Sequence, residues 1–190
     1  MSVYIIPTDT CYWLACPISE HESYDKIYKM KKRDYTKPLA IMVEDFKWLS
    51  QNTDLTPEQI QFLKDYENPF TILTESMPLS HWIQFEVEDV CFRNREVYPK
   101  IAIRIANNTE QAKLIKRVGP IFLTSANISD KPEIYKWSEL KTEFAYYLAN
   151  SKIELLWWYD LTYNNHTSDI FEFEWTTTEI KYLRKNKEES

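Results

Sequence analysis

The chain contains a single glycine, Gly119, among its 190 residues. Glycine normally makes up about 7% of a protein, and it supplies the positive-φ positions of tight turns and the close backbone approach to phosphates. The phosphate-binding P-loop and the dinucleotide-binding fingerprint each need several glycines, so both are excluded. If this chain binds a nucleotide, we expect it to use side chains and ordinary backbone.

The composition is that of a folded chain. Hydrophobic residues make up 44% and aromatic residues 15% of the sequence, and a chain of this length can form one compact core. We therefore expect a single domain over residues 1–190. The formal net charge of −6 argues against a broad basic surface for nucleic acid. A small cationic pocket for one nucleotide is compatible with that charge.

The side chains that most often bind metals are scattered along the sequence: Cys11, Cys16, His21, His81, Cys91 and His166. The cysteines are odd in number and lack paired spacing, which indicates reduced thiols rather than disulfides or a metal site. No apolar run approaches the roughly 20 residues of a membrane span, and Met1–Pro7 is too short for a signal peptide. We expect a cytoplasmic protein with no membrane anchor and no dedicated metal site.

Strand-like and helix-like segments alternate along the chain. Apolar runs predict strands at Val3–Ile6, Leu39–Val43, Phe70–Leu73, Ile101–Ile105, Ile121–Thr124, Ile153–Trp158, Ile170–Phe173 and Ile180–Leu183. Helical spacing predicts helices that begin near Ser19, Thr56, Thr109 and Ser138. Interleaved elements of this kind favour an α/β or α+β domain on one twisted sheet. The periodicity leaves the strand order open.

Three of these helix starts carry N-cap signals. Thr56 is followed by Pro57, which predicts an N-cap with proline in the first turn. Ser19 and Glu22 have the spacing of a capping box, and Ser138 is placed to cap the helix that follows it.

Three polar clusters follow predicted strands or helices, where ligands commonly gather in open sheets. They are Pro7–Tyr12, the basic stretch Lys29–Lys37, and Thr124–Ser129. The hydroxyls and carboxylate of the first can fix a small polar substrate, and the cations of the second can clamp phosphates. Taken singly, each cluster is better explained as a polar turn or a solvated face, because cations also suit the end of a helix.

The combination and order of these clusters resemble the YrdC/TsaC family. PTDTCYWLAC resembles its opening motif, MKKRDYTKPLAIMV its K-x-R segment and following strand, and TSANIS its S-x-N signature. Further matches are the arginine-bearing strand Ile101–Ile105, the late serine segment Ser168–Ile170 and the closing Leu183-Arg184. Six motifs in the family's order span the chain from Pro7 to Arg184.

The resemblance implies a YrdC-like fold, a twisted mixed β-sheet flanked by helices with a central cleft. It implies an enzyme, a nucleotidyltransferase that condenses L-threonine, bicarbonate and ATP into threonylcarbamoyl-AMP and pyrophosphate. Magnesium is expected to travel with ATP. The product would serve the threonylcarbamoyladenosine modification of tRNA through separate threonylcarbamoyl transferase proteins, with at most a weak RNA contact by this chain. Such a reaction needs mainly positioning and charge neutralisation.

The family pattern also implies roles for individual residues. Lys31 and Arg33 would be catalytic, holding the ATP phosphates and stabilising the charge that passes to pyrophosphate. The implied ATP-binding residues are Lys31, Arg33, Lys37, Asn127 and Arg184. The implied threonine-binding residues are Thr10, Arg104, Ser125 and Ser168, with Arg104 as the partner of the carboxylate.

Three glycines of the family pattern are replaced here, by Trp13, Asn68 and Asp130. An indole at position 13, beside Thr10, would narrow the threonine pocket. The alternative function is therefore a non-synthesising paralogue that binds a nucleotide or RNA. The intact cationic and S-x-N residues favour the synthase.

Overall fold

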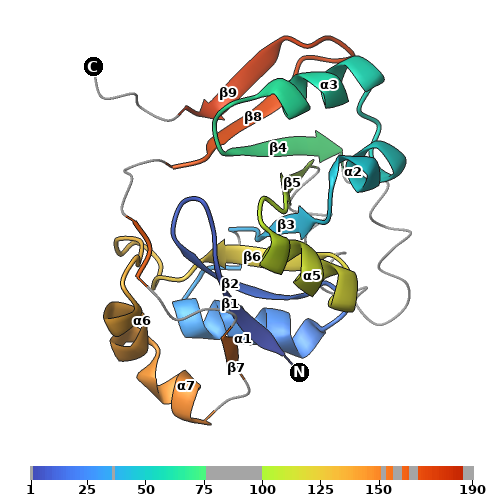
Figure 1. Ribbon diagram of the computed structural model, residues 1–190. Coiled ribbons are helices and arrows are strands. Elements are labelled where there is room, and N and C mark those ends of the chain that lie inside the picture. The colour runs from blue at the N-terminus through green and yellow to red at the C-terminus, as the bar shows by residue number, and fades with distance from the viewer. Residues whose placement is uncertain are drawn as a thin grey trace.

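The computed structural model describes residues 2–35, 37–75, 100–150, 153–155, 160–162 and 167–185. Its strands are β1 (Val3–Pro7), β2 (Tyr12–Pro17), β3 (Ala40–Val43), β4 (Phe70–Glu75), β5 (Lys100–Ile105), β6 (Ile121–Ser125), β7 (Ile153–Leu155), β8 (Asp169–Phe173) and β9 (Ile180–Arg184). Within this described part they form one nine-stranded sheet in the order β7-β1-β2-β6-β3-β5-β4-β8-β9 (Figure 1). The predicted α/β fold on one mixed sheet is confirmed.

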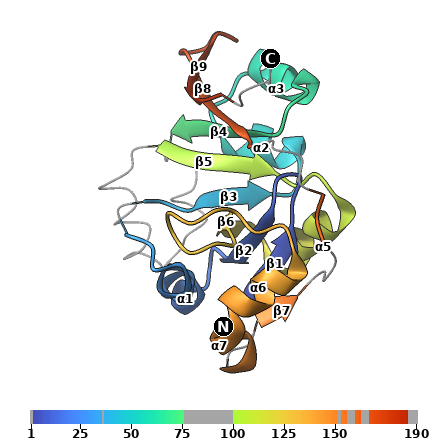
Figure 2. The same ribbon diagram turned by 90° about the vertical axis from the view of Figure 1, so that its left-hand side faces the viewer.

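The helices are α1 (His21–Lys31), α2 (Phe46–Asn52), α3 (Pro57–Asp65), α5 (Thr109–Val118), α6 (Trp137–Glu143) and α7 (Ala145–Asn150). Figures 1 and 2 show α2 and α3 beside β4 and β8, and α1, α6 and α7 near the β1 end of the sheet. The predicted strands agree with the observed ones to within two residues at each end, apart from β7, where residues 156–159 lie outside the described part. β2 and α2 are not among the predicted elements.

The sheet separates two hydrophobic cores, because successive residues of a strand face opposite sides. Ile5 and Leu14 belong to the larger core, which α1, α2, α3 and α6 cover. Tyr4, Ile6 and Ala15 belong to the smaller one, which α5 covers. The larger core stabilises the fold, and the other face is left partly open beyond α5.

The pairing of the central strands sets which polar residues meet. β3 and β5 are parallel, with Met42 opposite Arg104. β2 and β6 are antiparallel, with Trp13 opposite Ser125. Trp13, Ser125 and Arg104, which come from three different matched motifs, therefore lie on one face of the sheet.

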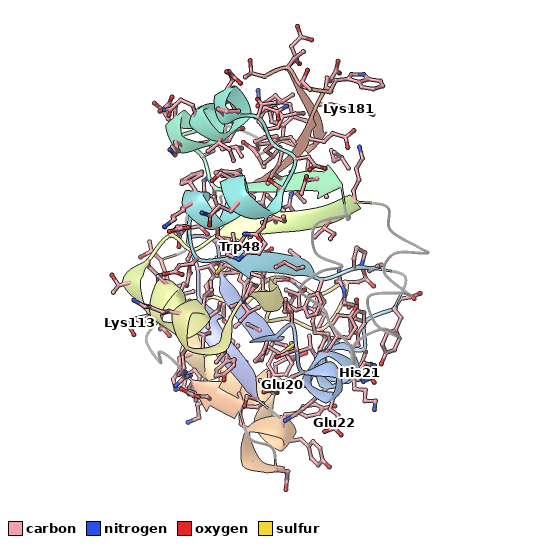
Figure 3. All side chains as sticks on the ribbon, turned by 90° about the vertical axis from the view of Figure 1, so that its right-hand side faces the viewer. Glu20, His21, Glu22, Trp48, Lys113 and Lys181 are labelled. Carbon is pink, nitrogen blue, oxygen red and sulfur yellow. The ribbon has the colours of Figure 1, made fainter. Side chains whose placement is uncertain are left out.

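The capping predictions have mixed outcomes. Thr56 caps α3 as predicted, in a reciprocal capping box with Gln59. The prediction for α1 is wrong, because Glu20 is its N-cap residue and makes no side-chain cap bond. Figure 3 labels Glu20 together with His21 and Glu22 at the start of this helix. The carboxylate of Glu20 accepts instead from Ser23 Oγ at 2.6 Å.

The helix predicted to begin at Ser138 begins one residue earlier, at Trp137. The backbone N–H of Trp137 donates to Asp160 Oδ1 at 2.8 Å, so a carboxylate from a distant segment satisfies this helix start. A break at Phe144 divides the predicted helix into α6 and α7, while Leu140 and Phe144 are buried as its face predicts. The predicted Ser138 cap is therefore wrong.

Gly119 ends α5 with a φ of 80°, and its N–H donates to Ile115 O at 2.7 Å. Three other described residues adopt positive φ without being glycine: Lys32, Asp130 and Trp175. Turns that would favour glycine are thus formed by side-chain-bearing residues, as the composition requires.

Candidate functional site

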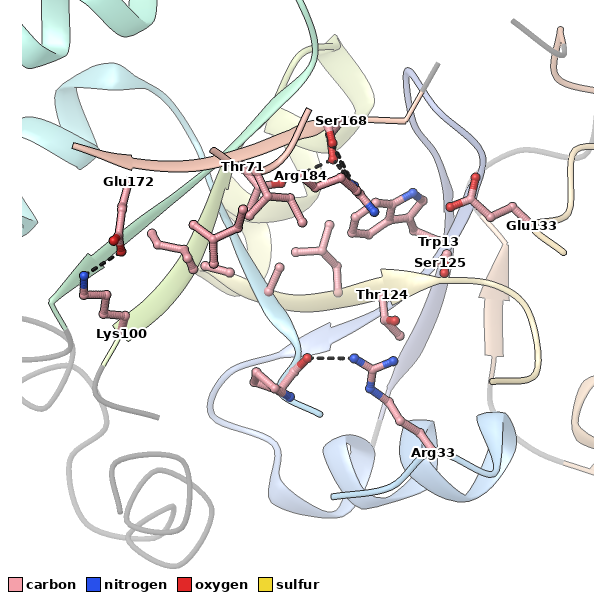
Figure 4. Close-up of a pocket in the computed structure, with 17 residues that line it drawn as sticks. Trp13, Arg33, Thr71, Lys100, Thr124, Ser125, Glu133, Ser168, Glu172 and Arg184 are labelled. Carbon is pink, nitrogen blue, oxygen red and sulfur yellow. Dashed lines mark hydrogen bonds and ion pairs between the residues drawn. The ribbon is translucent and has the colours of Figure 1, made fainter. Parts of the chain in front are cut away.

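A cleft with a volume of about 620 Å³ opens on the same face of the sheet as α5 (Figure 4). One residue from each of three strands forms its floor, namely Ala40 of β3, Ala102 of β5 and Leu123 of β6. Two of the three are alanines, whose small side chains leave room above the sheet. The polar and aromatic groups of the walls include Trp13, Arg33, Lys100, Ser125, Glu133, Ser168, Glu172 and Arg184.

Two arginines face each other across this cleft (Figure 4). Arg33 donates from Nε to Lys37 O at 2.9 Å and from Nη2 to Pro38 O at 2.9 Å. Arg184 donates from Nε and Nη2 to Ser168 O at 3.0 and 2.8 Å. These partners are neutral carbonyls, so each guanidinium is oriented while its positive charge stays available for an anion.

Two serines of the predicted threonine site line the cleft as well. Ser125 ends β6, next to Trp13 on the neighbouring strand. Ser168 precedes β8, accepts from Arg184 Nη2 at 2.9 Å, and lies 3.5 Å from the hydroxyl of Thr71. Ser168 and Arg184, implied to serve threonine and ATP respectively, are thus direct hydrogen-bond partners.

Lys31 and Asn127 lie behind the cleft wall. The side chain of Lys31 is 1% exposed and donates to Ser125 O, to Asn127 O at 2.6 Å and to Asn127 Oδ1 at 3.3 Å. An ammonium group has three protons, and all three are directed at this loop. Asn127 Nδ2 in turn donates to Ile128 O and Lys131 O. We refer to Lys31, Asn127 and the backbone that they bind as the buried frame.

Burial lowers the pKa of Lys31 to about 7, with a further contribution from the positive charge of Arg33. Among the described residues no carboxylate lies within ion-pair distance of Lys31. Carbonyl oxygens replace water around the ammonium, but they carry no full negative charge. Lys31 is therefore poised between its charged and neutral forms near neutral pH.

Arg104 lies in the sheet beneath Trp13. Its side chain is 3% exposed, and Nη2 bonds to Asp9 Oδ1 at 2.7 Å. Its Nε and Nη1 are buried and make no hydrogen bond. The Trp13 ring centroid lies 4.8 Å from Arg104 Cζ, and Trp13 Nε1 donates to Thr10 Oγ1 at 3.2 Å. The Trp13 indole thus covers the Arg104 guanidinium and uses the hydroxyl of Thr10 as a hydrogen-bond acceptor.

The two largest effects on the pKa of this arginine oppose each other. Burial lowers the pKa of Arg104, and the carboxylate of Asp9 opposes that effect. Because the guanidinium still has two unpartnered N–H groups, an additional anion beside it would be favourable. The position suits a carboxylate, which would have to pass Trp13 to reach the guanidinium.

The structure therefore divides the predicted site residues. Four line the cleft: Arg33, Ser125, Ser168 and Arg184. Four are buried behind its lining: Thr10, Lys31, Arg104 and Asn127. Lys37 is exposed and forms an ion pair with Asp130 at 3.3 Å instead of lining the cleft.

Sequence reasoning missed three charged residues of the cleft: Lys100, Glu133 and Glu172. Lys100 pairs with Glu172 at 2.5 Å, and this hydrogen bond lowers the pKa of Glu172. Strand alternation from Arg104 through Ala102 would have placed Lys100 on the same face. Glu133 lies in the loop after TSANIS, and no periodic signal identifies it.

No group of three potential metal-binding side chains occurs among the residues that the structure describes. Cys11 and Cys16 are buried free thiols, and burial raises the pKa of Cys11 to about 12, so it is not a thiolate nucleophile. His81, Cys91 and His166 lie outside the described part. In that part, no helix has the length and apolar character to cross a membrane.

Comparison with known sequences gives one family. The Sua5/YciO/YrdC family model, described as "Telomere recombination", matches residues 2–174. Threonylcarbamoyl-AMP synthase of Bos taurus is 31% identical over 133 residues, which cover 68% of this chain and 44% of that protein. The protein of the same name from Mus musculus is 27% identical over 135 residues, 43% of its length. The matched region is thus less than half of each relative.

Comparison with solved structures supports the same fold. P. abyssi Sua5 complexed with L-threonine has a TM-score of 0.72 at 23% identity, over 96% of this chain and 49% of that one. E. coli YciO has a TM-score of 0.71 at 16% identity, over 96% of this chain and 82% of that one.

The family model spans most of the sequence, and the structures agree with it in fold. That region contains five of the six ordered motifs and most of the cleft lining, while Leu183 and Arg184 lie beyond it. The chain belongs to the Sua5/YciO/YrdC family.

Proposed function

We propose that the chain is a threonylcarbamoyl-AMP synthase, which condenses L-threonine, bicarbonate and ATP and releases pyrophosphate. The observation that carries this proposal is the pair Arg33 and Arg184, held on opposite sides of the cleft by neutral carbonyls. Family membership and the names of the bovine and murine relatives support it. Magnesium would enter with ATP as part of that substrate.

In the proposed reaction, the amine of threonine and bicarbonate form a carbamate with loss of water, and a carbamate oxygen attacks the α-phosphorus of ATP. Negative charge then passes to the departing pyrophosphate, which Arg33 and Arg184 would stabilise from two sides. Arg104 would bind the threonine carboxylate, with the hydroxyls of Thr10, Ser125 and Ser168 close to the same substrate.

Three of the predicted ATP-binding residues require a change of arrangement. Lys31 and Asn127 can reach ATP only if the loop that they hold opens, since their polar atoms are already bonded within the buried frame. Lys37 would have to leave Asp130. We propose that Lys31 and Asn127 support ATP binding mainly by fixing the position of Ser125.

The product would pass to separate threonylcarbamoyl transferase proteins that modify tRNA in the cytoplasm. Any RNA contact of this chain would be weak and confined to the basic stretch Lys29–Lys37, because the net charge is −6.

The test is pyrophosphate release from MgATP, with and without L-threonine and bicarbonate, with the adenylate identified by mass spectrometry. We expect release to require both co-substrates. Arg33→Ala should reduce turnover at least about 100-fold, the size seen when one transition-state donor is lost. The control is Arg117→Ala, an exposed arginine paired with Glu154 on the surface. Pyrophosphate release that ignores threonine would rule out the synthase.

The second candidate is a non-synthesising paralogue that binds a nucleotide or RNA. The observation that favours it is Trp13, which covers Arg104 and occupies the Thr10 hydroxyl. This candidate predicts that ATP binds, measured by calorimetry, while L-threonine neither binds nor stimulates pyrophosphate release. Formation of threonylcarbamoyl-AMP by the purified chain excludes it.

A further inference from the structure

The cleft contains a carboxylate that none of the predicted roles uses. Glu133 lies in the loop between β6 and α6, and its side chain lines the cleft at the same end as Trp13 and Ser125 (Figure 4). Lys100 and Glu172 lie at the other end. Glu133 is half-buried and lines the space that a ligand would fill.

The two carboxylates of the cleft differ in how they are neutralised. Glu172 has Lys100 at 2.5 Å and Lys181 at 3.7 Å. Glu133 accepts a hydrogen bond from the Tyr135 hydroxyl at 3.0 Å, and no cationic group lies within 4.0 Å of it in the described part of the chain. The bond from Tyr135 orients the carboxylate through Oε2 and leaves Oε1 for a ligand. The carboxylate of Glu133 is therefore oriented by Tyr135 but has no cationic partner among the described residues.

Near the same end of the cleft, a positively charged side chain has hydrogen-bond donors without acceptors. Arg104 has two buried N–H groups without an acceptor. Trp13 connects the two groups in space, because it lines the cleft together with Glu133 and its ring centroid lies 4.8 Å from Arg104 Cζ. The charge of Glu133 also acts, as a minor contribution, to raise the pKa of Arg104. Arg104, which is paired with Asp9 but keeps Nε and Nη1 without an acceptor, and Glu133, which has no described cationic partner, are thus both associated with the part of the cleft that Trp13 lines.

The unused donors of Arg104 and the carboxylate of Glu133 are complementary to the two charged groups of an amino acid. We propose that Glu133 binds the α-ammonium group of the amino-acid substrate, while Arg104 takes its carboxylate. The inference rests on the proposed function and deepens it, because it explains how the site would select a zwitterion over a simple hydroxy acid. Charge-assisted hydrogen bonds of this kind are the strong ones in a site partly shielded from water.

The test compares L-threonine with 3-hydroxybutyrate, the same molecule without its amino group, by calorimetry at pH 7. Wild-type protein should bind L-threonine more tightly. Glu133→Gln keeps the size of the side chain and an acceptor for Tyr135, but removes the charge. It should weaken L-threonine binding at least about tenfold and leave 3-hydroxybutyrate unchanged.

Two controls accompany this comparison. Glu143→Gln removes a carboxylate that pairs with Lys131 outside the cleft, and it should change neither affinity. In the pyrophosphate assay, Glu133→Gln should raise KM for L-threonine and leave KM for ATP unchanged, whereas a misfolded site would alter both.

The possible failures are distinct. Equal affinities of wild type and Glu133→Gln for L-threonine overturn the inference and leave the synthase proposal standing. Equal weakening of both ligands also overturns it, because Glu133 would then act through the shape of the pocket. If wild-type protein binds no L-threonine and forms no adenylate, the proposed function falls and the inference falls with it.

Discussion

Lys31 and Arg33 lie two residues apart in one basic stretch, yet the structure uses their charges in opposite ways. Arg33 bonds to carbonyls four and five residues away and keeps its charge at the cleft. Lys31 is 1% exposed and directs its protons to a loop 94 or more residues further along the chain. One cation is oriented for a ligand, and the other holds the buried frame together.

The cause of this difference is local. Lys32, between them, adopts a left-handed conformation with a φ of 50°, which ends α1 and turns the chain. Lys31 is therefore the last residue of the helix and faces β6, while Arg33 begins the loop at the cleft. Closely spaced cations in a motif need not act on the same ligand, because one helix end is enough to separate them.

The largest expected effect separates the two residues by stability. Lys31→Met should lower the free energy of unfolding by about 3 kcal/mol, because two backbone carbonyls and the Asn127 amide oxygen lose a buried donor. Arg33→Met should change it by about 0.5 kcal/mol or less, since its side chain is only half-buried. Urea denaturation of the two matched variants measures this contrast. Similar losses of unfolding free energy in both variants would mean that Lys31 and Arg33 do not differ in structural role.

The second expected effect is a pH dependence that belongs to Lys31. Its pKa falls from 10.5 in water to about 7 in the fold. Above pH 7 the unfolded chain therefore binds a proton that the folded chain has lost, and stability rises with pH. Between pH 7 and 9 this contribution is about 2 kcal/mol.

The measurement is urea denaturation of wild type and Lys31→Met at pH 7 and pH 9. The difference in stability between the two proteins should widen at pH 9. Ionisation of the buried Cys11 thiol only in the unfolded state acts in both proteins and cancels in this difference. A gap that stays constant would mean that Lys31 remains fully charged in the fold, with its three oxygen acceptors outweighing burial.

The third prediction concerns Arg104, which lies behind the cleft because Trp13 covers it. Trp13→Gly should expose the two unpartnered N–H groups and free the Thr10 hydroxyl, tightening L-threonine binding about tenfold, or 1.4 kcal/mol. Trp13→Phe keeps the aromatic cover and removes only the indole donor, so its gain should be smaller. Calorimetry compares the three proteins. Loss of L-threonine binding in Trp13→Gly would show instead that the indole is a wall of the amino-acid pocket.

Sequence patterns were sufficient where the determinant was local. The apolar run before Pro7 predicts β1, and Thr56 with Pro57 predicts the start of α3. β2 was missed because its first residue belongs to a polar motif that looked like a turn. The predicted N-cap of α1 was wrong because Glu20, one residue after Ser19, is the N-cap residue.

The site was harder to predict, because its geometry depends on contacts that are remote in sequence. The motifs identify Lys31 and Asn127, but only the packing of α1 against the loop after β6 turns them inward. Glu133 is one charged residue in a loop, and only the fold places it at the cleft without a cationic partner. The motifs identify the segments that form the site, whereas tertiary contacts determine which side-chain atoms can contact a ligand.

The smallest expected effect tests the loop that Lys31 holds. Asp130 has a φ of 67°, where the resemblance places a glycine, and its side chain is exposed. A left-handed conformation costs an L-residue about 1 kcal/mol, and aspartate somewhat less. Asp130→Gly removes that strain, but it also makes the unfolded chain more flexible and loses an exposed ion pair of little value. The net gain should be about 0.5 kcal/mol or less.

Asp130→Ala is the matched variant, because it removes the same ion pair without relieving the backbone. It should be less stable than Asp130→Gly by about 1 kcal/mol in urea denaturation. Equal stabilities would mean that the loop can leave the left-handed conformation at no cost, and that the bonds from Lys31 do not hold its backbone. If alanine is the weaker variant, the loop is rigid even though glycine is missing, and the buried frame fixes a turn at which the family resemblance leads one to expect glycine.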